Sequence, residues 1–201
     1  MKNLAKIISV ICHPMLLPNY GYAMLLSSGA FFAHLSPIAI RVILLIVLIS
    51  TLILPLLSIP LSQLILRKKI DLNERKDRVY PFFFTILSYF LGAYWLRHLL
   101  INVIYSQVLI ICALVICIIQ LINLRWKISA HMAAIGGLLG IFFGVSELTT
   151  WNSFTVAVCG VLVAGLVGSS RLLLEKHTPA QVYAGFALGF TFPLCYLLFT
   201  L

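Results

Sequence analysis

Residues 42–66 read VILLIVLISTLILPLLSIPLSQLIL, a run without a single charged side chain. A helix needs about 20 apolar residues to cross the hydrocarbon core of a bilayer. Backbone inside that core must satisfy its own hydrogen bonds, and the run shows none of the apolar–polar alternation of a barrel strand. The stretch therefore predicts a transmembrane helix.

The whole chain has the same composition. Of its 201 residues, 62% are hydrophobic and 9% are charged, whereas a soluble domain has about 45–50% apolar and about 25% charged residues. Such a chain cannot cover a water-facing surface, so a soluble enzyme, a disordered protein and a disulfide scaffold are excluded. The net charge of +9 sits between apolar runs. We therefore expect anionic membrane lipids or an anionic substrate as partners, and no nucleic acid.

Six apolar segments without internal acidic residues are expected to cross the membrane: 37–66, 80–97, 99–123, 129–147, 152–169 and 178–200. The fold class is thus all-α, a polytopic transmembrane helical bundle with six core helices spread over residues 37–201. An N-terminal apolar segment, residues 1–36, precedes them. His13-Pro14 and Pro18 interrupt it, and proline prevents one straight helix. This segment forms either a seventh, kinked span or a re-entrant hairpin.

Small residues recur in segment 129–147, with Gly136, Gly140 and Gly144 at every fourth position. Small residues at this spacing let two helix backbones approach closely inside a membrane. We expect this face to pack tightly on another helix.

Six crossings place three loops at one face of the membrane, after the first, third and fifth segments. Ten of the 14 Lys and Arg residues fall in these loops, and Arg41 and Arg97 fall opposite. The preference of cytoplasmic loops for basic residues explains much of this asymmetry. A second explanation is a site for an anion, because serine and histidine accompany the charges in two of the loops.

Two histidines lie where helices should begin at this charged face. Ser129 is a candidate N-cap, which places His131 in the first helical turn, and Thr178-Pro179 start the last helix directly after His177. Helix N-termini favour phosphate. One imidazole can attack phosphorus, a second can protonate the leaving oxygen, and arginines can neutralise the remaining oxygens. The pattern predicts a phosphoryl-transfer site.

One stretch resembles the SRxxxxxH part of the third motif of the type 2 phosphatidic acid phosphatase (PAP2) superfamily. It reads Ser170-Arg171-Leu172-Leu173-Leu174-Glu175-Lys176-His177. Ser129-Ala130-His131 resembles the PSGH of that family's second motif. The resemblance covers roughly residues 60–201, with the motifs in the family's order and two spans between them. It implies a six-helix membrane phosphatase that acts on lipid or isoprenoid phosphates through a phosphohistidine, without a metal.

Carried over by position, the resemblance implies a role for each motif residue. His177 would be the nucleophile and His131 the general acid. The residues implied to hold the phosphate are Arg171, Ser129 and Ser170.

The chain departs from the family pattern in two of its motifs. Gln181 stands where the third motif has an aspartate, four residues after His177. Its amide oxygen can accept the same hydrogen bond one helical turn away, but it brings no charge. The first motif, KxxxxxxRP, is absent as written, and its nearest substitutes are Arg75 and Arg78 ahead of Pro81.

These departures leave a second hypothesis, a catalytically inactive PAP2-like protein that binds phosphorylated lipid or acts as a membrane scaffold. A transporter is a third possibility, but charged residues are absent from the middle of the segments. The chain has no HExxH motif and no cysteine cluster, so we expect no metal and no cofactor.

Two lines of reasoning place the charged face, which carries the motifs, on opposite sides of the membrane. The charge count places it in the cytoplasm, whereas the resemblance implies the external face of a bacterial inner membrane. Outside the motif face, His13 and His98 are expected to be interfacial residues.

Overall fold

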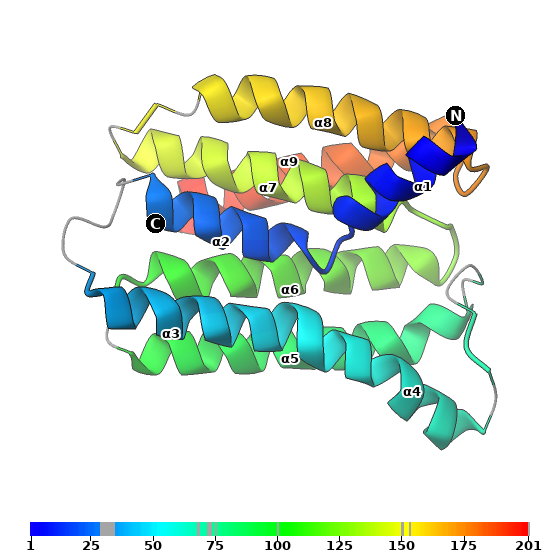
Figure 1. The fold of residues 1–201 in the computed structure, drawn as a ribbon, viewed down its shortest axis with the longest axis horizontal. Coiled ribbons are helices and arrows are strands. Elements are labelled where there is room, and N and C mark those ends of the chain that lie inside the picture. Colours follow the sequence, from blue (N-terminus) through cyan, green and yellow to red (C-terminus); the bar gives the residue numbers. More distant parts are fainter. Residues whose placement is uncertain are drawn as a thin grey trace.

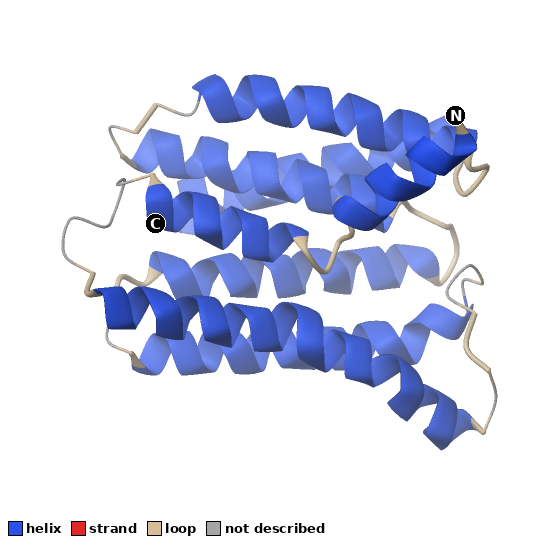
Figure 2. Ribbon diagram, in the orientation of Figure 1, coloured by secondary structure: helices blue, strands red, loops and turns tan. Residues whose placement is uncertain are grey.

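The computed structural model describes residues 1–28, 35–67, 69–71, 74, 76–99, 101–149, 151–152 and 154–200. Every regular element in these ranges is helical (Figure 2). In chain order the elements are α1 (Lys2–Ile11), α2 (Leu17–Ser27), α3 (Pro37–Leu48), η1 (Ile49–Ile53), α4 (Leu54–Leu66), η2 (Lys76–Arg78), α5 (Val79–His98), α6 (Ile104–Asn123), α7 (Ala130–Leu148), α8 (Phe154–Leu173) and α9 (Pro179–Thr200).

In the described part of the chain, six helical stretches are long and apolar enough to cross a membrane, and they run along the long axis of the bundle (Figure 1). They are Pro37–Leu66, Lys76–His98, Ile104–Asn123, Ala130–Leu148, Phe154–Leu173 and Pro179–Thr200. The six predicted segments are confirmed, and the chain is an integral membrane protein. The connections after α4, α6 and α8 lie at one end of the bundle, on the right in Figure 1.

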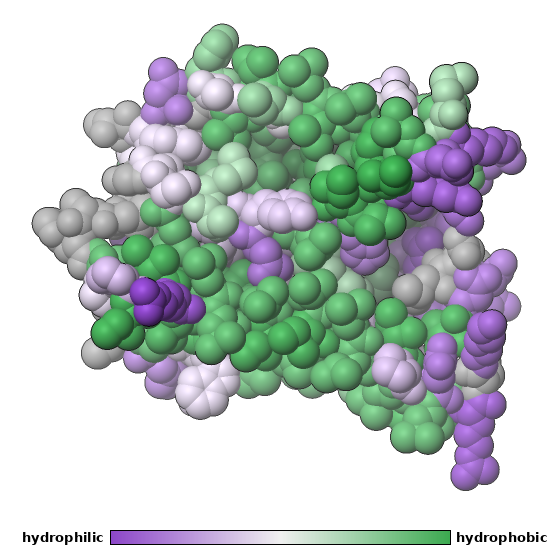
Figure 3. Space-filling view, viewed as in Figure 1, coloured by the Kyte–Doolittle hydropathy of each residue, from purple (hydrophilic) through white to green (hydrophobic). Residues whose placement is uncertain are grey.

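We call this end the charged end, because polar side chains gather there. They form the purple margin on the right of Figure 3, beside a broad apolar surface that suits contact with lipid. Among the described basic residues, Arg41 in the second turn of α3 and Arg97 near the end of α5 belong to the opposite end. The predicted charge asymmetry is therefore present in the fold.

The N-terminal segment crosses the bundle as two half-helices. α1 begins at the charged end, α2 finishes at the opposite end, and they meet between the two ends (Figure 1). At 10 and 11 residues, neither half is long enough to span a bilayer alone. Pro14 breaks the helix, and the N–H of His13 bonds to the carbonyl of Val10 instead of that of Ser9. The two half-helices follow one another along the bundle, and α2 does not return to the end where α1 begins.

The first long stretch bends where α3 passes through the π-helical turn η1 into α4. Pro55 follows this turn and has no N–H for the helical ladder, and a π turn is a common site of such a bend. Thr51 donates its hydroxyl to the Val47 carbonyl within the turn. The same hydroxyl accepts a hydrogen bond from Asn19 of α2, so the bend is tied to the N-terminal segment.

The glycine face of α7 packs on α9. A Cβ atom at Gly136 would collide with the carbonyl of Phe186, and one at Gly140 would collide with that of Phe190. The predicted close helix contact is confirmed. It holds the start of α7, which carries His131, beside the start of α9, which follows His177.

Candidate active site

A cavity of about 280 Å³ lies inside the bundle and is lined mainly by α2, α5, α6 and α7. Most of its wall is apolar. Five basic residues complete the wall, four from the charged end and His13 from the break between α1 and α2: His13, Arg78, His131, Arg171 and His177. The cavity thus joins a cationic head to an apolar body.

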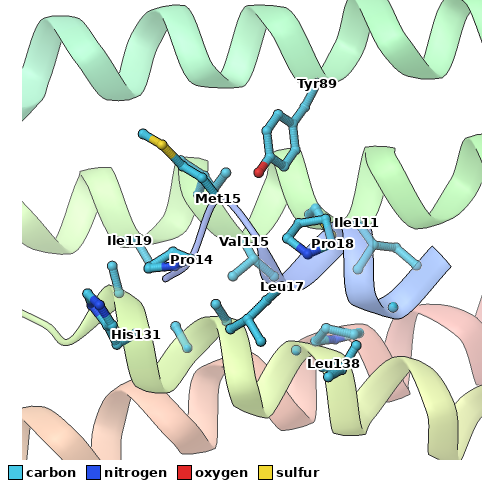
Figure 4. A pocket seen from close by; sticks show the side chains of 18 of the residues that line it. Pro14, Met15, Leu17, Pro18, Tyr89, Ile111, Val115, Ile119, His131 and Leu138 are labelled. Carbon is cyan, nitrogen blue, oxygen red and sulfur yellow. The ribbon is translucent and has the colours of Figure 1, made fainter. Parts of the chain in front are cut away.

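The apolar body follows α7 from Ala130 to Phe142, which is about 18 Å at 1.5 Å per residue. Figure 4 shows His131 at one end of the view, with Pro18 and Leu138 further along. This length is comparable to half of the roughly 30 Å hydrocarbon core of a bilayer. The shape suits an extended hydrocarbon tail whose polar head lies among the histidines and arginines.

The end of α8 turns the chain so that Arg171 and His177 line the same cavity. Glu175 adopts a left-handed backbone conformation with φ 54°. Its N–H bonds to the Leu172 carbonyl, and the N–H of Lys176 bonds to the Arg171 carbonyl. These two bonds form a Schellman helix ending. The resulting reversal explains why an arginine and a histidine six residues apart meet at one site.

His177 is buried, with 9% of its surface exposed. Its Nδ1–H donates to Oε1 of Gln181 at 3.0 Å, and the same oxygen accepts the N–H of Thr178 at 3.2 Å. A glutamine that reaches back from the third helical position in this way belongs to a capping box. Since the ring proton lies on Nδ1, Nε2 keeps its lone pair, which is the form that a nucleophile needs.

The surroundings of His177 favour its neutral form. Its pKa is lowered to about 4, chiefly by burial. The hydrogen bond to Gln181 acts in the opposite direction, and the charges of Arg171, Arg78 and Lys127 lower the pKa further. At neutral pH the imidazole of the free protein is therefore uncharged.

His131 lies in the first turn of α7, as predicted, and the N-terminal segment holds its ring. Its Nε2–H donates to the Ser9 carbonyl at 3.1 Å. That carbonyl is available because the helix break deprives it of its usual backbone donor. Nδ1 is then the nitrogen that can exchange a proton with a ligand. His131 also interacts electrostatically with Arg171 and His177.

Two arginines supply the positive charge. Arg171 acts electrostatically on all three cavity histidines, and its buried Nε has no hydrogen-bond partner in the described chain. A buried donor without a partner costs about 1–3 kcal/mol and therefore favours a ligand that supplies an acceptor. Arg78 is buried in η2, immediately before α5. Arg75, the other first-motif candidate, lies outside the described residues.

The two serines that the resemblance implies as phosphate ligands do not line the cavity. Ser170 is buried on α8 and donates its hydroxyl to the Leu166 carbonyl at 2.7 Å. Ser129 occupies the N-cap position of α7, as predicted, but its hydroxyl makes no capping bond. That hydroxyl is buried and has no partner among the described residues, and the backbone N–H of Ser129 bonds to the carbonyl of Gln181. In this conformation both serines lie behind the wall of the site.

His177 also borders the outside of the protein. It lines an open depression at the charged end together with Lys127, Lys176 and Gln181. The imidazole thus stands between the internal cavity and a basic surface, where water and inorganic anions have access.

His13 is a site residue that the sequence did not reveal. The sequence predicts an interfacial residue, but His13 lines the cavity, and its ring meets that of His131 edge-on with centroids 5.4 Å apart. The signal in the sequence was the His-Pro dipeptide inside an apolar run, which marks a helix break but not the element it faces. His98 is exposed at the opposite end.

Among the described residues, no group of three or more His, Cys, Asp or Glu could hold a metal ion. Imidazole and guanidinium groups instead offer hydrogen-bond donors to an anion. The chain matches no protein-family model, no curated protein and no solved structure. Its function therefore has to follow from the chemistry of the site.

Proposed function

We propose that the protein is a membrane phosphatase that hydrolyses a lipid or isoprenoid phosphate through a phosphohistidine intermediate, as its resemblance to the PAP2 superfamily implies. The supporting observation is that His131, His177, Arg171 and Arg78 line the head of a cavity whose body is apolar. The cationic head matches a phosphate dianion, and the apolar body matches a hydrocarbon tail.

In the first step, Nε2 of His177 attacks phosphorus, and the bond between phosphorus and the lipid oxygen breaks. His131, which takes up a proton once the bound phosphate dianion offsets the charges of the arginines, gives that proton to the leaving oxygen, and a lipid alcohol departs. Arg171 and Arg78 neutralise the non-bridging oxygens as charge develops on them. The products are the alcohol and a phosphorylated His177.

In the second step, a water molecule from the open depression attacks the phosphorus of the phosphohistidine. The neutral His131 now accepts a proton from that water, and the bond between phosphorus and Nε2 breaks. Inorganic phosphate leaves, and both histidines return to their starting states. The roles of His131 in the two steps are those of one group acting first as acid and then as base.

A catalytically inactive protein that binds phosphorylated lipid is the second candidate function. Gln181 is the observation that favours it, because a neutral amide stabilises a charged imidazole less than a carboxylate does. This candidate keeps the same ligand and the same cavity, and it differs only in the absence of turnover.

The proposed location is a bacterial inner membrane with the charged end in the cytoplasm. The basic residues of that end support this orientation, since cytoplasmic loops carry an excess of Lys and Arg. PAP2 resemblance favours the external face instead. Labelling of a cysteine introduced beside Lys176, in intact and in permeabilised cells, distinguishes the two.

The test is phosphate release by the purified full chain from phosphatidate and from a polyprenyl phosphate, with His177→Ala as the control. We expect release by the wild type and none by the variant. Release that survives His177→Ala undiminished would exclude His177 as the nucleophile. Binding of these lipids by the wild type without release of phosphate would establish the binding function.

A further inference from the structure

The break between α1 and α2 gives His13 a defined chemical form. Nδ1 of His13 accepts a hydrogen bond from the backbone N–H of Met15 at 3.3 Å. An imidazole nitrogen that accepts carries no proton, so the ring proton of neutral His13 lies on Nε2. Within the described chain no residue hydrogen-bonds to this Nε2, and the side chain lines the cavity.

Contacts on both sides hold the break between α1 and α2 in place. Nδ2 of Asn19 donates to the Met15 carbonyl at 3.2 Å and to Oγ1 of Thr51 at 2.8 Å, which ties the start of α2 to the bend of the first long helix. On the other side, α1 packs along α8, the helix that carries Arg171. The ring of His13 is thus held at a set place in the cavity wall.

The neighbours of His13 are the groups of the proposed phosphate site. Its ring contacts that of His131, and Arg171 lies near enough to act on it electrostatically. The Nε of Arg171 is itself buried without a partner. A phosphate that satisfied Arg171 would lie within this cluster, where a neutral N–H adds a hydrogen bond to the anion without adding charge.

We propose that His13 is a third imidazole of the site and donates its Nε2–H to an oxygen of the bound phosphate. The inference rests on the proposed function only in taking phosphate as the ligand. It makes the N-terminal half-helices part of the active site, in addition to the six long helices.

Two substitutions separate the two nitrogens of the ring. His13→Asn keeps an acceptor near the position of Nδ1, so the bond from Met15 and the helix break can persist, but it offers no donor as far out as Nε2. His13→Gln places an amide N–H close to the position of Nε2. His98→Ala, at the opposite end, is the matched control.

The experiment measures the affinity of the detergent-solubilised full chain for inorganic phosphate, from the rise of its melting temperature with phosphate concentration. Hydrogen bonds to charged groups are the stronger ones. We expect His13→Asn to bind phosphate about tenfold more weakly, His13→Gln to stay within about threefold of the wild type, and His98→Ala to be unchanged. Equal affinity of His13→Asn and the wild type would overturn the proposal.

Lipid phosphate hydrolysis by the same proteins separates this inference from the proposed function. In one outcome the wild type binds phosphate better than His13→Asn but releases none from lipid phosphates. This result supports the role of His13 in the phosphate site and contradicts the proposed phosphatase activity. In the other outcome the wild type hydrolyses lipid phosphates and His13→Asn binds phosphate as well as the wild type does. This result supports the phosphatase activity and contradicts the role of His13. Failure of the wild type to bind phosphate at all overturns both.

Discussion

His177 donates its Nδ1–H to Oε1 of Gln181, one helical turn further along the chain, at 3.0 Å. The bond fixes which nitrogen of His177 carries the proton and leaves Nε2 available for attack on phosphorus. It also decides how well the site tolerates positive charge on His177 during the reaction, because the acceptor is a neutral amide. The residue at position 181 should therefore control both the rate and its pH dependence.

Gln181→Asp should raise the rate several-fold or leave it equal, and it should move the acidic limb of the pH–rate profile upward. A hydrogen bond to a charged group is worth roughly 1 kcal/mol more than a neutral one, or about fivefold in rate. In the wild type the pKa of His177 is lowered to about 4, so the acidic limb, where protonation removes the nucleophile, should lie near pH 4. A carboxylate favours the protonated imidazole and raises that pKa.

Gln181→Leu is the counterpart, since it removes the acceptor without introducing a charge. It should slow turnover and lower the pH of the acidic limb further, because the hydrogen bond to Gln181 raises the pKa of His177. Profiles of kcat/KM against pH for the three proteins measure both effects. If neither substitution alters the rate or the limb, Gln181 does not act on the reacting histidine.

His131→Ala should slow turnover about 10²–10⁴-fold, which is the usual contribution of general acid–base catalysis. The loss should shrink for a substrate whose leaving group needs no proton, such as p-nitrophenyl phosphate. Comparison of that ester with a lipid phosphate in one assay checks the prediction. An equal loss on both substrates would assign His131 to phosphate binding in place of proton transfer.

Gly137→Leu should block the apolar body of the cavity. A Cβ atom at Gly137 meets only the Gly189 carbonyl, at 3.7 Å, so the helix accepts the substitution while the rest of the side chain competes with the lipid tail. Each displaced methylene is worth about 0.8 kcal/mol, so kcat/KM for a long-chain lipid phosphate should fall about tenfold or more. Hydrolysis of p-nitrophenyl phosphate should persist.

Gly165→Leu is the matched control for this prediction. It makes the same change on α8, where a Cβ atom meets nothing within 4 Å. Activity on both substrates should stay at the wild-type level. Equal effects of the two substitutions on the lipid substrate would mean that the cavity does not hold the tail.

Glu175→Gly should stabilise the protein. Glu175 holds a left-handed conformation that costs a side-chain-bearing residue about 1–2 kcal/mol, and its salt bridge to Lys2 is too exposed to offset this. We expect a melting temperature about 2–4 °C higher, as about 1 kcal/mol gives for a chain of this size. Arg67, directly after α4, also has a positive φ of 50°, so Arg67→Gly should raise the melting temperature in the same way. A lower melting temperature for both variants would contradict this explanation.

The sequence predicts the six long helices well, because apolar length alone separates spans from loops in a membrane protein. Local signals also predict the Gln181–His177 bond and the break at Pro14, since both depend on residues within one or two turns. The contact between His131 and Ser9 joins residues 122 positions apart. It depends on how the half-helices pack on the bundle, and no local pattern encodes that.

The serines also show that a local sequence pattern predicts the position of a residue but not the contacts of its side chain. Ser129 is at the helix start that its residue type predicts, but its hydroxyl makes no capping bond, and its carbonyl lies against Gly185 of α9. His13 looked like an interfacial residue because its surroundings in the chain are apolar. Its place in the cavity follows from the broken helix and from the neighbours that this helix meets.

The most direct test of a phosphohistidine mechanism is to trap the intermediate. The purified wild type is mixed with a lipid phosphate labelled with ³²P and quenched within the first turnover, and the protein is then analysed for bound label. We predict label that is stable in alkali, lost in acid and mapped to His177, with none on His177→Ala. Phosphate release without any label on His177, or equal label on the His177→Ala variant, would contradict the mechanism.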